Sequence, residues 1–496
     1  MTRKQLIRLC TATLAVAVLA LSVSGTGLAR AATCPQCIVV DDGGDTGACD
    51  PNTYTLHILR CAIIYANTHA GTWIRFAPGL QAVLLQSALP TITGDSTWID
   101  GHDLSNGCVC PRIDGLFASP WTGNALTINA SFVTISNIRI VNIPADADIA
   151  VTGGIDTAIA YDYLGLLPTA TQCGGQAQST VGVEVAHLRT GSAGSDHGTA
   201  YIYANTISCH GGSGVEVVDS NYVYVGTQRD NNTSPGNNIG TTANGVGAAG
   251  NGYAGVRVAV NSDQVKVTNN QIAYNASGGV IIQDGSNMSV INNRLSANYW
   301  GLAISGGITE SIEFNKIGTS PDGTSPMPNA HEGIIIYGGS GLYLSANLVA
   351  YNGAAGIAVL GNNTHAQIGN NEIRNNGGLP IDLGNDGATI NGSRSLPGPN
   401  NWLPYPTGTF NGTGFFGNAC PNCIVYIFKA IGNPAGPGGG GIVQAIGQAD
   451  GSGNWQRTTP AGLTGLNASF TATDAGGNTS EMSPQKIYLY LPLIRR

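Results

Sequence analysis

The chain has 496 residues, of which 42% are hydrophobic and only 10% are charged, and it contains 71 glycines. Its formal net charge of −8 argues against nucleic acid as a partner, and its hydrophobic content argues against a disordered chain. Few charges among abundant Gly, Asn, Ser and Thr are typical of stacked turns and sheets rather than of amphipathic helices.

The first residues predict export. Three basic residues precede an apolar run, Thr13 to Val23, and the small-residue site Ala29-Arg30-Ala31 follows, which together indicate a signal peptide over residues 1–31. No segment reaches the roughly 20 apolar residues that a membrane span needs. We therefore expect a secreted or cell-surface protein, whose net charge falls from −8 to −12 when the four basic residues of the leader are removed.

Ten cysteines remain after removal of the leader, and they form sequence-local pairs: Cys34/Cys37, Cys49/Cys61, Cys108/Cys110, Cys173/Cys209 and Cys420/Cys423. In an exported protein such pairs predict disulfides. Two of the pairs have CxxC spacing, which also allows a metal or redox site. Their separation in sequence and their location outside the cytosol favour disulfides.

A short helix is predicted before the main body of the chain. Apolar residues at Leu56, Leu59, Ile63 and Ile64 have helical spacing, and a strand begins at Trp73. We predict that residues 32–115 form an N-terminal cap with the first coils, because the open end of a stacked structure needs a cover.

An internal repeat determines the predicted fold. The frame Asn-x-(Ile/Leu/Val) recurs at spacings of 32, 33, 23, 22, 32 and 24 residues, starting at Asn205, Asn237, Asn270, Asn293, Asn315, Asn347 and Asn371. Each frame is followed by a short β-rich run, so each repeat is one coil that buries a single face. We predict an all-β protein with a right-handed parallel β-helix of the pectate-lyase type over residues 116–406.

The asparagine of the frame has a structural explanation. Its amide tolerates a left-handed backbone and can bond to the matching Asn one coil away, which predicts a buried ladder. His210 occupies a turn position where other coils carry asparagine, so we expect it to replace an amide in a side ladder rather than to act as a base. The longer coils carry Gly- and Pro-rich insertions that project as loops.

The N-terminal motifs carry a family resemblance. Leu59-Arg60-Cys61-Ala62-Ile63 and Ala66-Asn67 resemble the CSLREA-type segment of secreted bacterial β-helix proteins, although Cys61 stands where that family has Glu. The resemblance extends over about Val39 to Pro406. It implies the fold and not an activity, since such proteins include polysaccharide lyases, glycoside hydrolases and non-catalytic surface proteins.

The composition changes after a Pro-rich break that begins at Leu396. Alternating runs at Ile424, Ile442 and Ala468 predict strands, and we expect a small immunoglobulin-like β-sandwich over residues 407–487. Trp455 is predicted to lie in its core. Residues 488–496 form an apolar and then basic tail, which is either a last strand or a sorting signal.

Candidate catalytic residues are outward side chains that stack across coils. Aligning the coils at their Gly-Val strands gives two columns: Glu184, Glu216 and Arg257 in the first, and His187, Asp219 and Asp284 in the second. Coils lie about 4.8 Å apart, so two acids in one column match the spacing of a retaining glycosidase, or of an inverting one if a coil is skipped. Crowding would also raise the pKa of one carboxyl.

Two other interpretations of these residues remain open. As a lyase, Glu216, Asp219 and Asp284 would hold Ca²⁺ against a uronate while Arg257 withdraws the C5 proton. No other cofactor is expected. In the alternative without chemistry, all six are ordinary solvated side chains.

A further outward column offers rings and polar groups that suit a sugar chain. Its predicted members are Tyr224, Lys266, Ser289, Glu313, Tyr343 and Gln367, of which Tyr224, Lys266 and Tyr343 are the candidate substrate-binding residues. The expected partner is an extracellular polysaccharide, bound or cleaved by a monomeric protein. The alternative is a non-enzymatic surface or adhesion protein whose β-helix is a rigid stalk.

Overall fold

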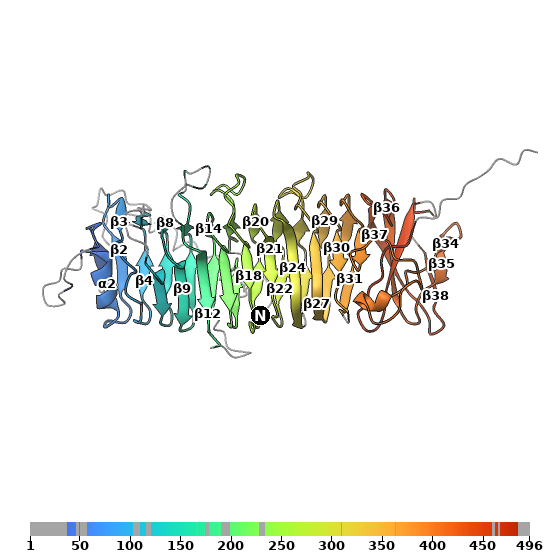
Figure 1. Cartoon of the computed structure of the whole chain (residues 1–496), viewed down its shortest axis with the longest axis horizontal. Helices are drawn as coiled ribbons and strands as arrows, with labels where there is room; N and C mark the ends of the chain where they lie inside the picture. Colours follow the sequence, from blue (N-terminus) through green and yellow to red (C-terminus); the bar gives the residue numbers. More distant parts are fainter. Residues whose placement is uncertain are drawn as a thin grey trace, which may run out of the picture.

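The computed structural model describes residues 37–45, 49, 57–102, 110–115, 121–167, 169, 171, 173, 178–189, 199–227, 234–308, 310–362, 364–458, 462–464 and 467–484. The predicted signal peptide and C-terminal tail lie outside these residues. The described strands wind into a straight solenoid with a helix at one end and a small β module at the other (Figure 1).

Three long sheets run along the solenoid. Sheet A consists of β1 (Cys37–Val40), β2 (Trp73–Phe76), β4 (Trp98–Asp100), β7 (Thr134–Ser136), β10 (Thr157–Ala160), β13 (Ala200–Tyr203), β16 (Val223–Val225), β19 (Lys266–Thr268), β22 (Ser289–Ile291), β25 (Ser311–Glu313), β28 (Leu342–Ser345) and β31 (Ala366–Gly369).

Sheet B consists of β3 (Ala82–Leu84), β5 (Arg112–Asp114), β8 (Arg139–Val141), β11 (Tyr163–Leu164), β14 (Thr206–Ile207), β17 (Asn238–Ile239), β20 (Gln271–Ala273), β23 (Arg294–Ser296), β26 (Lys316–Ile317), β29 (Leu348–Ala350), β32 (Glu372–Arg374), β37 (Gly440–Gln448), β36 (Ile424–Ile431) and β39 (Ala468–Thr473).

Sheet C consists of β6 (Asn124–Asn129), β9 (Ala147–Gly153), β12 (Val181–Ala186), β15 (Val215–Val218), β18 (Val256–Val258), β21 (Gly278–Ile282), β24 (Trp300–Ile308), β27 (Ile334–Ser340), β30 (Ile357–Val359) and β33 (Ile381–Leu383).

From β4 onward each coil contributes one strand to each sheet in the order A, B, C, as β16, β17 and β18 do, and neighbouring coils pair in parallel. Inward residues such as Val215 and Val217 are fully buried and form one continuous aliphatic core. The predicted insertions are confirmed as small hairpins, closed by Thr241–Ala248 and Thr319–Pro326 bridges, between sheet B and sheet C. The all-β solenoid is therefore as predicted.

The asparagine ladder is confirmed from Asn205 to Asn371. The Nδ2 group of each buried ladder Asn donates to Oδ1 of the next ladder Asn at 2.9–3.1 Å. That Oδ1 also accepts a hydrogen bond from the backbone N–H of the donating Asn, as Asn315 Oδ1 does from Asn293. One part of the explanation was wrong, because the left-handed residue is the one before six of the seven ladder positions, for example Asn269 or Asn292, and not the ladder Asn itself. The ladder Asn bonds to the next coil through its side-chain amide and its backbone N–H.

A second ladder runs parallel to the first, and it confirms the structural role expected for His210. Its amides are Asn251, Asn275, Asn298, Asn329, Asn352 and Asn376. His210 Nδ1 lies 3.0 Å from Asn251 Oδ1, and Nε2 lies 3.0 Å from Asp148 Oδ2, with both side chains buried. Both ring nitrogens of His210 therefore contact a buried partner, one in the second ladder and one on Asp148.

The N-terminal cap contains the predicted helix. Helix α2 (Leu59–Ala66) packs on β1 and β2, and its apolar residues join the solenoid core. The Cys49–Cys61 disulfide is confirmed, and the Arg60 guanidinium donates to both carboxylate oxygens of Asp45 at 2.8 and 2.7 Å. The cap therefore covers the apolar end of the first coil.

The C-terminal module is built onto the last coil. Strands β36, β37 and β39 are antiparallel and continue sheet B through the Ile373–Gly441 pair, while β34 (Thr409–Phe410), β35 (Gly414–Asn418) and β38 (Asn454–Thr458) form a second small sheet. Trp455 is 3% exposed in the core between the two sheets, as predicted. A 3₁₀ turn (Pro399–Trp402) precedes the module.

The Cys173–Cys209 and Cys420–Cys423 disulfides are also present, and Cys37 and Cys110 are disulfide-bonded, although their predicted partners lie outside the described residues. These bonds indicate a compartment outside the reducing cytosol. In the part of the chain that the structure describes, no helix is long and apolar enough to cross a bilayer.

Replacing the ladder residue Asn293 by leucine should lower the free energy of unfolding by about 1–3 kcal/mol, because it leaves the backbone N–H of Asn270 and the Nδ2 group of that residue without their acceptor. Thermal and denaturant unfolding would measure the loss. The exposed Asn362→Leu variant is the control and should unfold like the wild type. An equal stability of both variants would contradict the ladder.

Candidate functional site

The outward face of sheet C carries the first predicted column in the expected register. Glu184 in β12 pairs with Glu216 in β15, and Glu216 pairs with Arg257 in β18. The three alternate with inward valines, so their side chains point away from the core and are partly exposed. The two carboxylates thus belong to adjacent coils, whose strands lie about 4.8 Å apart.

The two glutamates have different surroundings. Arg257 Nη1 donates to Glu216 Oε1, while Arg257 Nε and Nη2 both donate to Gln283 Oε1 at 3.0 and 2.8 Å. Among the described residues no ion pair joins Glu184 to a cation, and burial, followed by the charge of Glu216, raises its pKa above the usual value. Glu184 is therefore the carboxyl of the pair that favours its protonated form.

Retaining glycosidases use a proton donor and a carboxylate about 5 Å apart, and adjacent coils of a β-helix have a similar spacing. Arg257 donates three hydrogen bonds, one to Glu216 and two to Gln283, and its role as a C5 base stays a prediction.

The second predicted column is only partly assembled. His187 Nδ1 lies 3.4 Å from Asp219 Oδ2, and Arg189 Nε donates to Asp219 Oδ1 at 2.6 Å; the hydrogen bond from Arg189 lowers the pKa of Asp219. Continuing the strand register places Val260 between Asp219 and Asp284. Asp284 is thus two coils from Asp219.

The structure does not support the proposed Ca²⁺ ligands. Glu216 and Asp219 are each paired with an arginine. Among the described residues, no three His, Cys, Asp or Glu side chains gather as a metal site would require. We derive no step through a metal ion.

A cluster of rings that the sequence analysis missed lies further along sheet C. We call Tyr299, Trp300, His331 and Tyr337 the aromatic shelf. Tyr299 stacks on His331 with ring centroids 4.0 Å apart and meets Trp300 edge-on at 4.7 Å, and Trp300 meets Tyr337 edge-on at 6.5 Å. Trp300 also packs against outward apolar residues of sheet C, including Ile281 and Ile335.

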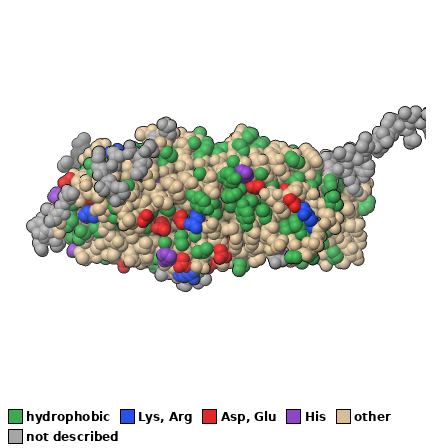
Figure 2. Space-filling model, in the orientation of Figure 1, with side chains coloured by type: hydrophobic (Ala, Val, Ile, Leu, Met, Phe, Trp, Pro, Cys, Tyr) green, Lys and Arg blue, Asp and Glu red, His purple; other side chains and the backbone are tan. Residues whose placement is uncertain are grey.

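The space-filling view shows both features on one face. Charged side chains gather over β12 to β18, and a hydrophobic patch follows them along the solenoid over β21 to β27 (Figure 2). Tyr299 and His331 occupy equivalent turn positions in successive coils, so their alignment was the sequence signal that could have revealed the shelf.

The predicted substrate-binding residues lie on sheet A and not beside the glutamates. Lys266 Nζ lies 5.1 Å from the ring centroid of Tyr224, and Tyr224 stacks on Tyr201. Tyr343 is three coils beyond Lys266. The assignment of Glu313 to this column was wrong. The residue that pairs with Ser289 and Tyr343 is Ser311, whereas Glu313 pairs with Ile291 and Ser345.

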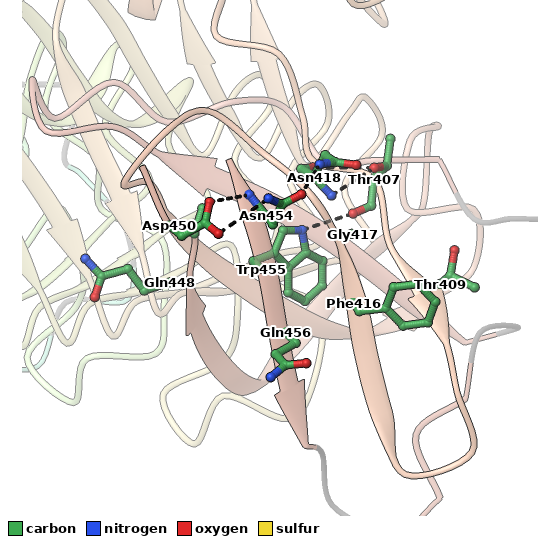
Figure 3. A pocket seen from close by; sticks show the side chains of 11 residues that line it. Thr407, Thr409, Phe416, Gly417, Asn418, Gln448, Asp450, Asn454, Trp455 and Gln456 are labelled. Carbon is green, nitrogen blue, oxygen red and sulfur yellow. Dashed lines mark hydrogen bonds between the residues drawn. The ribbon is translucent and has the colours of Figure 1, made fainter. Parts of the chain in front are cut away.

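The C-terminal module contains an open pocket of about 680 Å³. Figure 3 shows the Phe416 ring, Gln448 and Gln456 around it, together with a hydrogen-bonded group in which Asn418 donates to Asn454 and Asn454 to Asp450. Trp455 Nε1 donates to the backbone oxygen of Thr407, so the indole is fixed in the pocket wall. Several polar groups that line the pocket therefore make hydrogen bonds within the module.

Comparison with known proteins supports the fold. Residues 184–373 match the family described as "right handed beta helix region", which confirms the predicted hand of the solenoid. The structure is similar to the Dettilon tailspike protein, with 11% identity, a TM-score of 0.37 and coverage of 90% of this chain and 91% of that one.

It is also similar to two epimerases. The periplasmic alginate epimerase AlgG is 13% identical with a TM-score of 0.31, and 65% of this chain covers 72% of it. The A-module of the Azotobacter vinelandii mannuronan C-5 epimerase AlgE4 is 11% identical with a TM-score of 0.31, and 60% of this chain covers 86% of it. These similarities are too distant to bear on activity. No curated protein matches the chain.

The Glu216→Gln variant should lower the pKa of Glu184 while leaving it above its ordinary value, because the substitution removes a neighbouring charge but not the burial that dominates the shift. Carboxyl ¹³C titration by NMR would measure the pKa of Glu184 in the wild type and in the variant. Asp219→Asn is the control and should leave the pKa of Glu184 in place. An unchanged value in Glu216→Gln would show that the two carboxyls are not coupled.

Proposed function

We propose that this protein binds an extended extracellular polysaccharide along the outward face of sheet C and hydrolyses its glycosidic bonds. The observation that carries the proposal is the in-register pair Glu184 and Glu216, in which one carboxyl has a raised pKa and the other is paired with Arg257. Pairs of acids whose surroundings separate their protonation states suit general acid and nucleophile roles.

In the proposed reaction, Glu184 donates its proton to the glycosidic oxygen as the bond to the anomeric carbon breaks. Glu216 attacks that carbon and forms a glycosyl–enzyme ester. Glu184, now a carboxylate, takes a proton from water, whose oxygen displaces Glu216 and releases a sugar with the original anomeric configuration. Arg257 donates a hydrogen bond to Glu216 and orients its carboxyl for the attack.

A stalk function is the second candidate, and the continuity of sheet B into the C-terminal module favours it. Because β37 pairs directly with β32, the module extends the rod rather than hanging from a linker. A protein of this shape can hold a binding surface away from a cell without any chemistry. The sheet A residues Tyr224, Lys266 and Tyr343 would then be the proposed contact surface for a glycan.

Glu184→Gln and Glu216→Gln should each lower the rate of reducing-end release from the polysaccharide that the wild type cleaves by at least about 100-fold. The first variant lacks the general acid and the second lacks the nucleophile. Activity should fall as pH rises through the raised pKa of Glu184, because the general acid must be protonated. Chelator should have no effect.

Glu313→Gln on sheet A is the matched control for these variants and should retain wild-type activity. Product release should be screened over a polysaccharide panel together with absorbance at 235 nm, which detects unsaturated lyase products. Absorbance that depends on added Ca²⁺, or binding without any turnover, would overturn the hydrolase assignment.

A further inference from the structure

The aromatic shelf lies on the same face as the glutamate pair, further along the solenoid axis. Glu216, Arg257, Ile281, Ala303 and Ile335 occupy one outward column in successive coils. A chain lying along this column would pass from the glutamates onto the shelf. The shelf is therefore in line with the proposed cleavage site and about three coils away from it, or roughly 14 Å.

The rings of the shelf are held in place and yet accessible. Trp300 Nε1 donates to Glu332 Oε2 at 3.0 Å, and Asn385 Nδ2 donates to the other oxygen of that carboxylate at 3.1 Å, while Glu332 itself is only 5% exposed. Tyr299 and Tyr337 remain 38% and 43% exposed. A fixed indole beside exposed phenol rings forms a preorganised stacking surface, which lowers the entropic cost of binding.

The charges around the shelf indicate which sugars it accepts. Beyond Arg257 the described outward column continues as Ile281, Ala303, Ile335 and Ala358 and ends at Asp382, so it offers a uronate no cation. The Glu332 carboxyl accepts a hydrogen bond from Trp300, and its Coulombic interaction, after burial, raises the pKa of Tyr337. An apolar floor beside an acidic side chain favours the C–H faces of neutral sugars over the carboxylates of uronates.

We propose that the aromatic shelf binds neutral pyranose rings, and that the substrate is a neutral polysaccharide rather than a polyuronate. The inference rests on the proposed function for the position of the cleaved bond. The binding of neutral sugars by the shelf does not depend on that chemistry.

The test is isothermal titration of the full-length Glu184→Gln protein with hexasaccharides, so that binding is measured without turnover. The neutral probes are cellohexaose, xylohexaose and laminarihexaose, and the anionic probes are hexagalacturonate and hexamannuronate. We expect at least one neutral probe to bind and both anionic probes to fail. Tighter binding of either anionic probe, or binding of none of the five, would overturn the proposal.

Within this background, Trp300→Ala should weaken binding of the neutral probe by at least about tenfold. Tyr337→Ala, at an exposed position of β27, provides a second variant if the tryptophan change impairs folding. Phe314→Ala is the matched control, because Phe314 is an exposed ring away from sheet C and its loss should leave affinity unchanged. Wild-type affinity in both shelf variants would overturn the proposal.

The outcomes for the shelf and for the chemistry are separable. Neutral oligosaccharide binding that requires Trp300, in a protein that releases no product from any polysaccharide, would sustain the shelf and refute the hydrolase. Cleavage that requires Glu184 and Glu216, with unchanged neutral binding in Trp300→Ala and Tyr337→Ala, would sustain the hydrolase and refute the shelf.

Discussion

Each central coil of the solenoid is tied to the next by a buried asparagine that satisfies both a backbone N–H and a neighbouring amide. The solenoid strands of sheets A and B have two to four residues and make few hydrogen bonds, so the polar groups at the turns must be satisfied by other means. The two amide ladders do so at the same places in the central coils. They therefore impose one register on all three sheets.

A common register has consequences for the surface. Because residues in register on adjacent coils lie about 4.8 Å apart, two glutamates at equivalent positions are close enough for their charges to interact. Arg257 pairs with Glu216, while burial, followed by the charge of Glu216, raises the pKa of Glu184. The same rule brings Tyr299 and His331 into a ring stack one coil apart. Columns of like position thus act as the functional units of this fold.

On their N-terminal side, both ladders end at residues other than asparagine. At its N-terminal end the second ladder stops at His210, whose ring reaches Asp148 in place of an amide, and the first ladder passes to Asp162. Burial raises the pKa of Asp162 well above its usual value, which makes it able to present a protonated oxygen. Helix α2 and the C-terminal module then cover the two ends of the core, where strand edges would otherwise be open.

The sequence by itself determined the coil, the ladder and the column of Glu184, Glu216 and Arg257, because a strict repeat of asparagine and β-branched residues defines register directly. It determined His210 as a ladder member for the same reason. It failed at Glu313, since strand side chains alternate with period two and a slip of two residues keeps the same face. The tertiary structure alone decided which sheet each column occupies, that burial raises the pKa of Glu184, and that rings from turns and strands of separate coils meet as a shelf. These features depend on burial and on how side chains from different coils pack together, which no local sequence pattern specifies.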